Sequence, residues 1–182
     1  TDHLLENPRT VHPANVVKAK LNYAATLRAT YNVTGQFGLT ADGTVATRFP
    51  RINEYAGTGP TEEQYKRVTI PLIRGGLFYK KPWINLTSMV TYISKSNNID
   101  QQNLTKPGTE EGKTVLLIYN IKTLGWTTSA EIDPFKGFHL QALFTYQKPV
   151  YKNYNASVPF NDGSELSVNA NGMLVKEIPQ IL

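Results

Sequence analysis

Apolar and polar residues alternate in six segments of the chain, and this alternation predicts β-strands. In the first segment the odd-numbered positions are Tyr23, Ala25, Leu27, Ala29 and Tyr31, with mainly Thr, Ala and Arg between them. A period of two places successive side chains on opposite faces of a strand, whereas a helix requires a period near 3.6. The pattern recurs at 36–49, 73–80, 84–93, 124–132 and 138–147.

Two further stretches complete the expected strand set. The apolar stretch from Val115 to Ile121 is expected to be the upper part of the fifth strand, and a seventh strand is expected to begin near Met173. Residues 1–20 are expected to lead into this array, which then occupies 21–182.

The links between these segments alternate between short and long. The short links are 33–35, 81–83 and 133–137, and the long ones are 50–71, 94–114 and 148–172. In an up-and-down meander, alternate links fall at opposite ends, and outer-membrane barrels have short turns at one end and longer loops at the other. The sequence therefore predicts an all-β fold: an antiparallel up-and-down meander of about seven long strands, part of a transmembrane β-barrel.

The two predicted faces differ in chemistry. Within the six segments the apolar stripe carries no charged residue, and its aromatic residues lie mainly toward the strand ends, as in the aromatic girdles of barrels. The opposite stripe is mostly small and polar, and Phe78, Met89, Ile93 and Leu143 interrupt it without explanation. A soluble β-sandwich remains the alternative, although its outer face would usually carry more Lys and Glu.

Composition excludes several other classes. The net charge of +5 comes from scattered basic residues rather than a clustered patch, which argues against nucleic-acid binding. The chain has no cysteine, so it has no disulfide or thiolate metal site. His3, His12 and His139 are too dispersed for a metal cluster, and we expect neither a metal nor a cofactor.

Three stretches resemble the TonB-dependent outer-membrane receptors, particularly those of Bacteroidetes-type bacteria. Leu39–Tyr55 (LTADGTVATRFPRINEY) is similar to a strand of that family and the extracellular loop after it. Thr123–Tyr151 resembles a family hairpin with a Pro-Phe-Lys-Gly turn, and Val175–Leu182 resembles the start of the next strand. The similarity covers most of Leu21–Leu182, and it consists of strand and turn patterns rather than catalytic signatures.

The resemblance implies a plugged barrel of 22 strands in the outer membrane. Such a receptor imports a scarce nutrient, such as an iron chelate, cobalamin or an oligosaccharide, with energy delivered through TonB. The plug domain and the terminal strands are missing from this sequence, so we expect a fragment that cannot transport alone. Its partners would be outer-membrane lipid, its own plug and through it TonB, and a small ligand, while its unpaired edge strands invite pairing with a second copy.

Two groups of candidate site residues follow from the predicted topology. The ligand-binding candidates lie in the long links and are Arg51, Glu54, Tyr55, Tyr65, Tyr151 and Tyr154. The candidates for contact with the plug lie on the polar face and are Arg28, Asp42, Arg48, Arg74 and Glu131. For each loop residue the competing interpretation is a solvated side chain, and for each polar-face residue it is a charge bonded to a neighbouring strand.

We expect no enzymatic activity. No Gly-x-Ser-x-Gly elbow, P-loop or dinucleotide fingerprint occurs in the sequence. The best Ser/His pair that the predicted topology offers for a hydrolase is Ser129 with His139. A soluble carbohydrate-binding β-sandwich that presents Tyr55, Tyr65 and Tyr154 is the second functional hypothesis.

Overall fold

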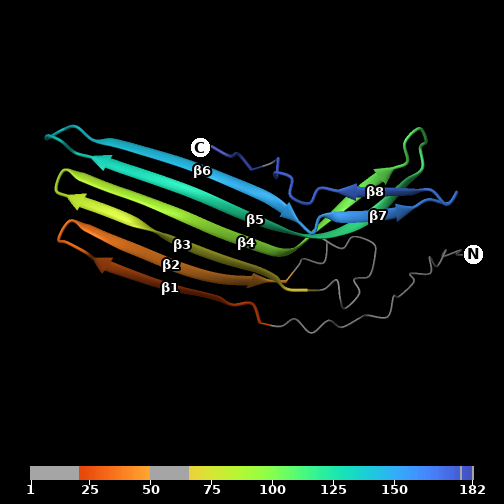
Figure 1. Ribbon diagram of the computed structural model, residues 1–182, viewed down its shortest axis with the longest axis horizontal. Helices are drawn as coiled ribbons and strands as arrows, with labels where there is room; N and C mark the ends of the chain where they lie inside the picture. Colours follow the sequence, from red (N-terminus) through yellow and green to blue (C-terminus); the bar gives the residue numbers. More distant parts are fainter. Residues whose placement is uncertain (1–20, 50–65, 177, 182) are drawn as a thin grey trace, which may run out of the picture.

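The computed structural model describes residues 21–49, 66–176 and 178–181, and its regular elements there are β-strands (Figure 1). No helix within these ranges is long and apolar enough to cross a membrane. The strands are β1 (Ala24–Asn32), β2 (Phe37–Arg48), β3 (Val68–Lys81), β4 (Ile84–Thr105), β5 (Gly112–Ile132), β6 (Leu140–Lys152), β7 (Asn155–Pro159) and β8 (Glu165–Asn169).

The first six strands form one antiparallel sheet in sequence order, which confirms the predicted meander. The links β1–β2, β3–β4 and β5–β6 lie together at one end of the sheet, as predicted, and Figure 1 shows them at the left. We call this the short-turn end. The sheet is open: β1 and β6 are its two edges, and it does not close into a barrel.

The strand registers bring the six predicted apolar stripes onto one face of the sheet, called here the apolar face. One row of directly paired residues crosses all six strands: Ala29, Ala41, Gly75, Val90, Trp126 and Tyr146. The neighbouring row on the opposite, polar face is Arg28, Asp42, Arg74, Thr91, Gly125 and Gln147. A slip of one residue in any pair would turn a stripe over, so the predicted phase of every strand is confirmed.

Strands β4 and β5 continue well beyond their neighbours, which corrects the prediction of a long loop at 94–114. Residues Asn98–Thr105 pair with Gly112–Tyr119, and only 106–111 link the two strands. The prediction failed because Ser, Asn and Gln occupy both faces of the outer part of β4, so alternation gives no contrast there. Backbone pairing, which needs no apolar side chain, forms the hairpin nonetheless. The expected extension of the fifth strand through Val115–Ile121 is confirmed.

A β-bulge between Lys95 and Asn98 marks the start of this extension. Asn97 has a φ of 54°, a left-handed conformation that Asn adopts more readily than most residues. Its backbone N–H donates to the side-chain oxygen of Asn120 (2.9 Å), and its side-chain amide donates to the carbonyl of Arg67 (2.8 Å). One extra residue on β4 reverses the alternation there, so Asp100, opposite Leu117, joins the polar side.

The predicted loop at 148–172 is also largely strand. Its first residues complete β6, and β7 and β8 form a hairpin whose β7 contacts β5. Leu117 of β5, Val158 of β7 and the nearby Phe160 are each at most 5% exposed, which makes this a small apolar core. The hairpin covers the polar side of the β4–β5 extension, because the β5 residues that it contacts alternate with the apolar stripe.

The last described segment runs along the edge of β6, where a seventh strand was expected. Tyr151 donates its backbone N–H to the Met173 carbonyl (2.9 Å), and Gln147 donates to the Gln180 carbonyl (2.7 Å). Only isolated bridges at Leu174 and Ile181 form, so the expected regular strand is not present. Between them Pro179 has no N–H to donate to a ladder.

Two consecutive glycines of β3 are expected to respond in opposite ways when each is changed to alanine. A Cβ on Gly76 would lie 2.0 Å from the Ser88 carbonyl oxygen, whereas one on Gly75 would meet nothing within 4 Å. We expect Gly76→Ala to lower the free energy of unfolding by about 1–3 kcal/mol, because backbone atoms must move. Gly75→Ala should be neutral or stabilising, since it removes the entropy cost of a strand glycine. Urea titration of the two variants measures the difference, and equal effects would contradict the close β3–β4 approach.

One interruption of the polar stripe now has a structural role. A Cβ on Gly38 would lie 2.4 Å from the ring of Phe78, its direct partner on β3. The aromatic ring therefore covers the glycine, and a large residue at one position matches the missing side chain at the other. Met89, Ile93 and Leu143 have no comparable explanation.

Candidate functional site

The apolar face is the largest feature that could contact a partner. Many of its large side chains are exposed, as Leu27 (79%), Val90 (53%) and Trp126 (46%) illustrate. The only other sheet in the described ranges is the β7–β8 hairpin, which contacts the polar side of β5. Contiguous exposed apolar patches larger than a few hundred Å² mark protein or membrane contact sites.

The charged residues on this face of β1–β6, together with Arg67 just before β3, are all basic. They lie near the two ends of the face. Lys81 is at the short-turn end, with its Nζ atom 5.6 Å from the centre of the Tyr79 ring. Lys122 of β5 and Lys148 and Lys152 of β6 lie toward the opposite end of the sheet, called here the long-link end, and the first two are exposed. The sequence prediction missed these three lysines for two reasons. It ended the sixth strand at Gln147, and it did not assign the residues in the upper part of the fifth strand to one face or the other.

Arg67 lies between two aromatic residues at the same end. Its guanidinium carbon is 5.4 Å from the centre of the Tyr23 ring and 5.2 Å from that of Phe49, and a terminal nitrogen donates to the Leu21 carbonyl (3.0 Å). Cation–π contacts of this kind stabilise an Arg beside aromatic rings. They hold β1, β2 and β3 together beyond the regular pairing.

On the polar face the structure brings three predicted plug-contact residues together. Arg28, Asp42 and Arg74 are direct partners across β1, β2 and β3. The Arg74 Nε atom donates to both oxygens of the Asp42 carboxylate, at 2.9 and 3.1 Å, and Asp42 is 4% exposed. Arg28 is exposed beside this pair, which leaves a net positive charge on the β1–β3 part of the polar face.

The other two predicted polar-face residues lie near opposite ends of the sheet. Glu131, close to the short-turn end, accepts a hydrogen bond from the Asn85 side-chain amide (3.1 Å). Arg48 ends β2 at the long-link end, opposite Val68. The structure therefore does not gather all five predicted residues into one site, and their contact with a plug stays a prediction.

Two of the predicted ligand-binding residues form an aromatic cluster with a tyrosine of β5. Tyr151 and Tyr154 lie with their ring centres 4.9 Å apart, and Tyr119 of β5 lies 5.5 and 4.9 Å from them. Burial raises the pKa of Tyr154 above its ordinary value, and the nearby negative charge of Asp100 adds to the effect. The cluster therefore presents the neutral hydroxyl of Tyr154 near the Asp100 carboxylate, at the base of the β4–β5 extension.

Sequence reasoning missed Tyr119 and Asp100. Tyr119 belongs to a stretch that is apolar on both faces, and Asp100 reaches the polar side only because of the bulge at Asn97. Arg51, Glu54, Tyr55 and Tyr65 lie outside the described residues, so their assignment to a binding surface stays a prediction.

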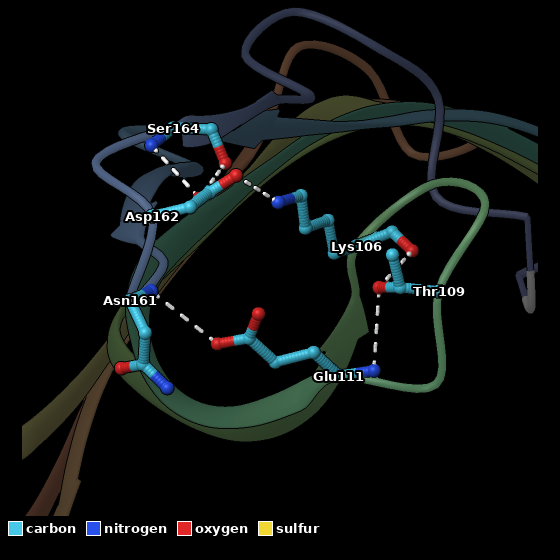
Figure 2. Close-up of polar contacts among 6 residues, drawn as sticks. All are labelled: Lys106, Thr109, Glu111, Asn161, Asp162 and Ser164. Carbon is cyan, nitrogen blue, oxygen red and sulfur yellow. Dashed lines mark hydrogen bonds and ion pairs between the residues drawn. The ribbon is translucent and has the colours of Figure 1, made fainter.

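Polar contacts fasten the turn of the β7–β8 hairpin to the β4–β5 turn (Figure 2). Lys106 forms an ion pair with Asp162, and the Glu111 carboxylate accepts from the backbone N–H of Asn161 (3.3 Å). Hydrogen bonds from Lys106 and Ser164 hold the pKa of the exposed Asp162 carboxyl well below its usual range. Lys113 also donates to the Pro159 carbonyl (2.6 Å), so the contacts include the β4–β5 turn and the start of β5.

The candidate hydrolase pair is not assembled at the short-turn end. The Nδ1 atom of His139 lies 2.7 Å from an Asp133 carboxylate oxygen within the same turn. Ser129 is paired with Leu143 on β6, and Leu143 lies four residues after His139. At the rise of a strand, this separates Leu143 from His139 by roughly 13 Å. Across the described ranges, moreover, no three His, Asp or Glu side chains are placed to hold a metal ion.

Comparisons of the chain with models of known protein families, with curated proteins and with solved structures find no match. The family therefore stays a prediction from resemblance. What carries a functional proposal is the two-faced sheet and the clusters at its long-link end.

Proposed function

We propose that this chain is a wall segment of a TonB-dependent outer-membrane receptor that imports a scarce nutrient, and that the segment alone does not transport. The observation that carries the proposal is the exposed apolar face. Its centre is uncharged across six strands, and its charges are basic and confined to the ends.

Hydrocarbon is the medium in which such a face is stable. In water, an exposed apolar surface across six strands favours aggregation, whereas in a bilayer it replaces no hydrogen bonds and contacts lipid chains. Strands of 9 to 22 residues also support the proposal, since a tilted membrane-crossing strand needs about 9–11. A soluble sandwich would need a second sheet over Val90 and Trp126, and the described strands supply none.

The same geometry supports a lumen on the polar side. Asp42 and Arg74 pair there rather than toward lipid, and the β7–β8 hairpin leans over this side at the long-link end. In the proposed receptor that end faces the cell exterior. Tyr151 and Tyr154 would then lie at the mouth of the barrel, where an incoming ligand makes its first contacts.

The open edges define what the segment lacks. The N–H and C=O groups on the outer side of β1 have no neighbouring strand within the described ranges, and the short-turn half of β6 is likewise unpaired. In the complete receptor, further strands would occupy these positions. The isolated chain is instead expected to pair edge to edge with a second copy.

The two tryptophans of the chain give a direct test of the proposed membrane location. Trp126 lies in the middle of the apolar face, whereas Trp83 lies in the β3–β4 turn. In single-tryptophan variants (Trp83→Phe or Trp126→Phe) reconstituted in vesicles, lipids brominated deep in the acyl chain should quench Trp126 most strongly. Lipids brominated near the headgroup should quench Trp83 most strongly, as expected for aromatic residues at the membrane interface.

A different result would reject this location. If both tryptophans were quenched by aqueous iodide and neither by brominated lipid, the apolar face would be in contact with water. If the purified protein were a monodisperse monomer without detergent or lipid, a soluble sandwich would be favoured.

A further inference from the structure

We infer that Lys122, Lys148 and Lys152 form a binding surface for the anionic headgroups of the lipid leaflet at the long-link end. The inference rests on the proposed membrane location and adds to it the charge class of the lipid. It begins from the pairing of β5 with β6. Lys122 is directly opposite Val150, so Lys148 and Lys152 are its two diagonal neighbours on β6.

Diagonal neighbours across antiparallel strands lie about 7–8 Å apart, within reach of long side chains. Three ammonium groups are thus gathered on one side of the sheet. No acidic residue shares the apolar face of β1–β6, so no side chain there neutralises them. The polar face differs, since Asp42 neutralises Arg74 on it.

The position of the three lysines matches the boundary of the apolar band. Lys148 is paired with Leu124, and on β5 the apolar stripe of the six-stranded part of the sheet is interrupted beyond Leu124 by Lys122 and Asn120, before Ile118 in the extension. Lysine stems extend along apolar surface while their charged ends reach the headgroup level. Phosphate groups of anionic lipids at that level carry the complementary charge, and each lysine near such a surface strengthens association roughly fivefold.

The test compares vesicles of phosphatidylcholine with vesicles that also contain phosphatidylglycerol, using flotation of the full chain. Wild type should bind both, and it should bind the anionic vesicles about a hundredfold more tightly at low salt if all three lysines act together. The variant Lys122→Gln/Lys148→Gln/Lys152→Gln should keep its neutral-vesicle binding and lose the anionic gain. Salt should remove the gain in wild type, because exposed charges are screened.

The matched control removes three exposed lysines elsewhere, Lys66, Lys80 and Lys136, each changed to Gln. It has the same net charge as the test variant and should retain most of the gain. If both variants lost the gain equally, or if wild type showed none, the lysine inference would fail while binding to neutral vesicles still supported the membrane location. Failure of wild type to bind neutral vesicles would instead reject the membrane location, on which the inference rests.

Discussion

Val90→Arg is expected to lower the free energy of unfolding in vesicles by about 2–4 kcal/mol, the cost of an arginine near mid-membrane on the face that we propose contacts lipid. Val90 lies in the row of partners that crosses the centre of the apolar face, between Gly75 and Trp126. Its side chain contacts few atoms of the chain itself, since the residue is 53% exposed. The expected cost therefore comes from the surrounding medium, and urea titration of the vesicle-bound protein measures it.

The adjacent residue provides the control. Met89 lies on the polar face, opposite Gly76 and Thr127, and its side chain is unbranched, as that of arginine is up to the guanidinium group. Met89→Arg adds the same charge to the same strand, and it should cost much less because the polar side is solvated in the proposed barrel. If the two variants were destabilised equally, the assignment of lipid and lumen faces would be wrong. If neither were affected, the apolar face would lie in water.

Asp42→Ala carries the second large effect, a loss of about 2–3 kcal/mol in the free energy of unfolding. The substitution removes the carboxylate that accepts two hydrogen bonds from Arg74 and leaves two arginines as near neighbours of the vacated position. Breaking a fully buried ion pair costs 3–5 kcal/mol. The expected value is lower because the Arg74 side chain is 38% exposed and keeps part of its hydration.

A double variant separates the ion pair from simple packing. Asp42→Ala combined with Arg74→Met removes both charges and should recover much of the lost stability, since an absent pair leaves no uncompensated charge. Arg28→Met in the Asp42→Ala background should give a smaller recovery by relieving repulsion. Denaturant titration of all variants in one detergent gives the coupling energy, and strictly additive losses would contradict the charge explanation.

The alternation of apolar residues was sufficient to predict the sheet and the face on which each stripe lies. Tyr31, Val90 and Trp126 each belong to a stripe with clear contrast between faces, and a one-residue slip would have been visible as a broken pattern. The turn chemistry agreed: Thr34 accepts hydrogen bonds from the backbone N–H groups of Gln36 and Phe37, as expected for a tight turn.

The outer part of the fold was not predictable in the same way. From Asn98 to Thr105 the chain is mostly polar on both faces, with only Ile99 and Leu104 apolar, and its strand conformation comes from pairing with β5. The stretch around Leu117 is apolar on both faces, because the β7–β8 hairpin covers the side of β5 that is polar elsewhere in the strand. Contacts between segments distant in sequence decide both cases, and a local period cannot report them.

The site predictions were limited by the same cause. Tyr151 and Tyr154 were proposed from their position in a long link, yet their aromatic partner Tyr119 comes from another strand. The pairing of Asp42 with Arg74 required the register of β2 and β3, whereas the residues themselves were identified from their face. Residue type and face were thus readable from sequence, and the partners were not.

The bulge at Asn97 divides β4 into two stretches with independent phase. Inside the sheet, the identity of each β4 side chain is tied to the stripes of its neighbours; past Asn97 only β5 and the hairpin above it impose a constraint. Insertions of two residues, or exchange of the whole tip, leave the inner stripes untouched. This strand can therefore diversify at its outer half, at the end that faces the ligand in the proposed receptor, while the half within the sheet stays fixed.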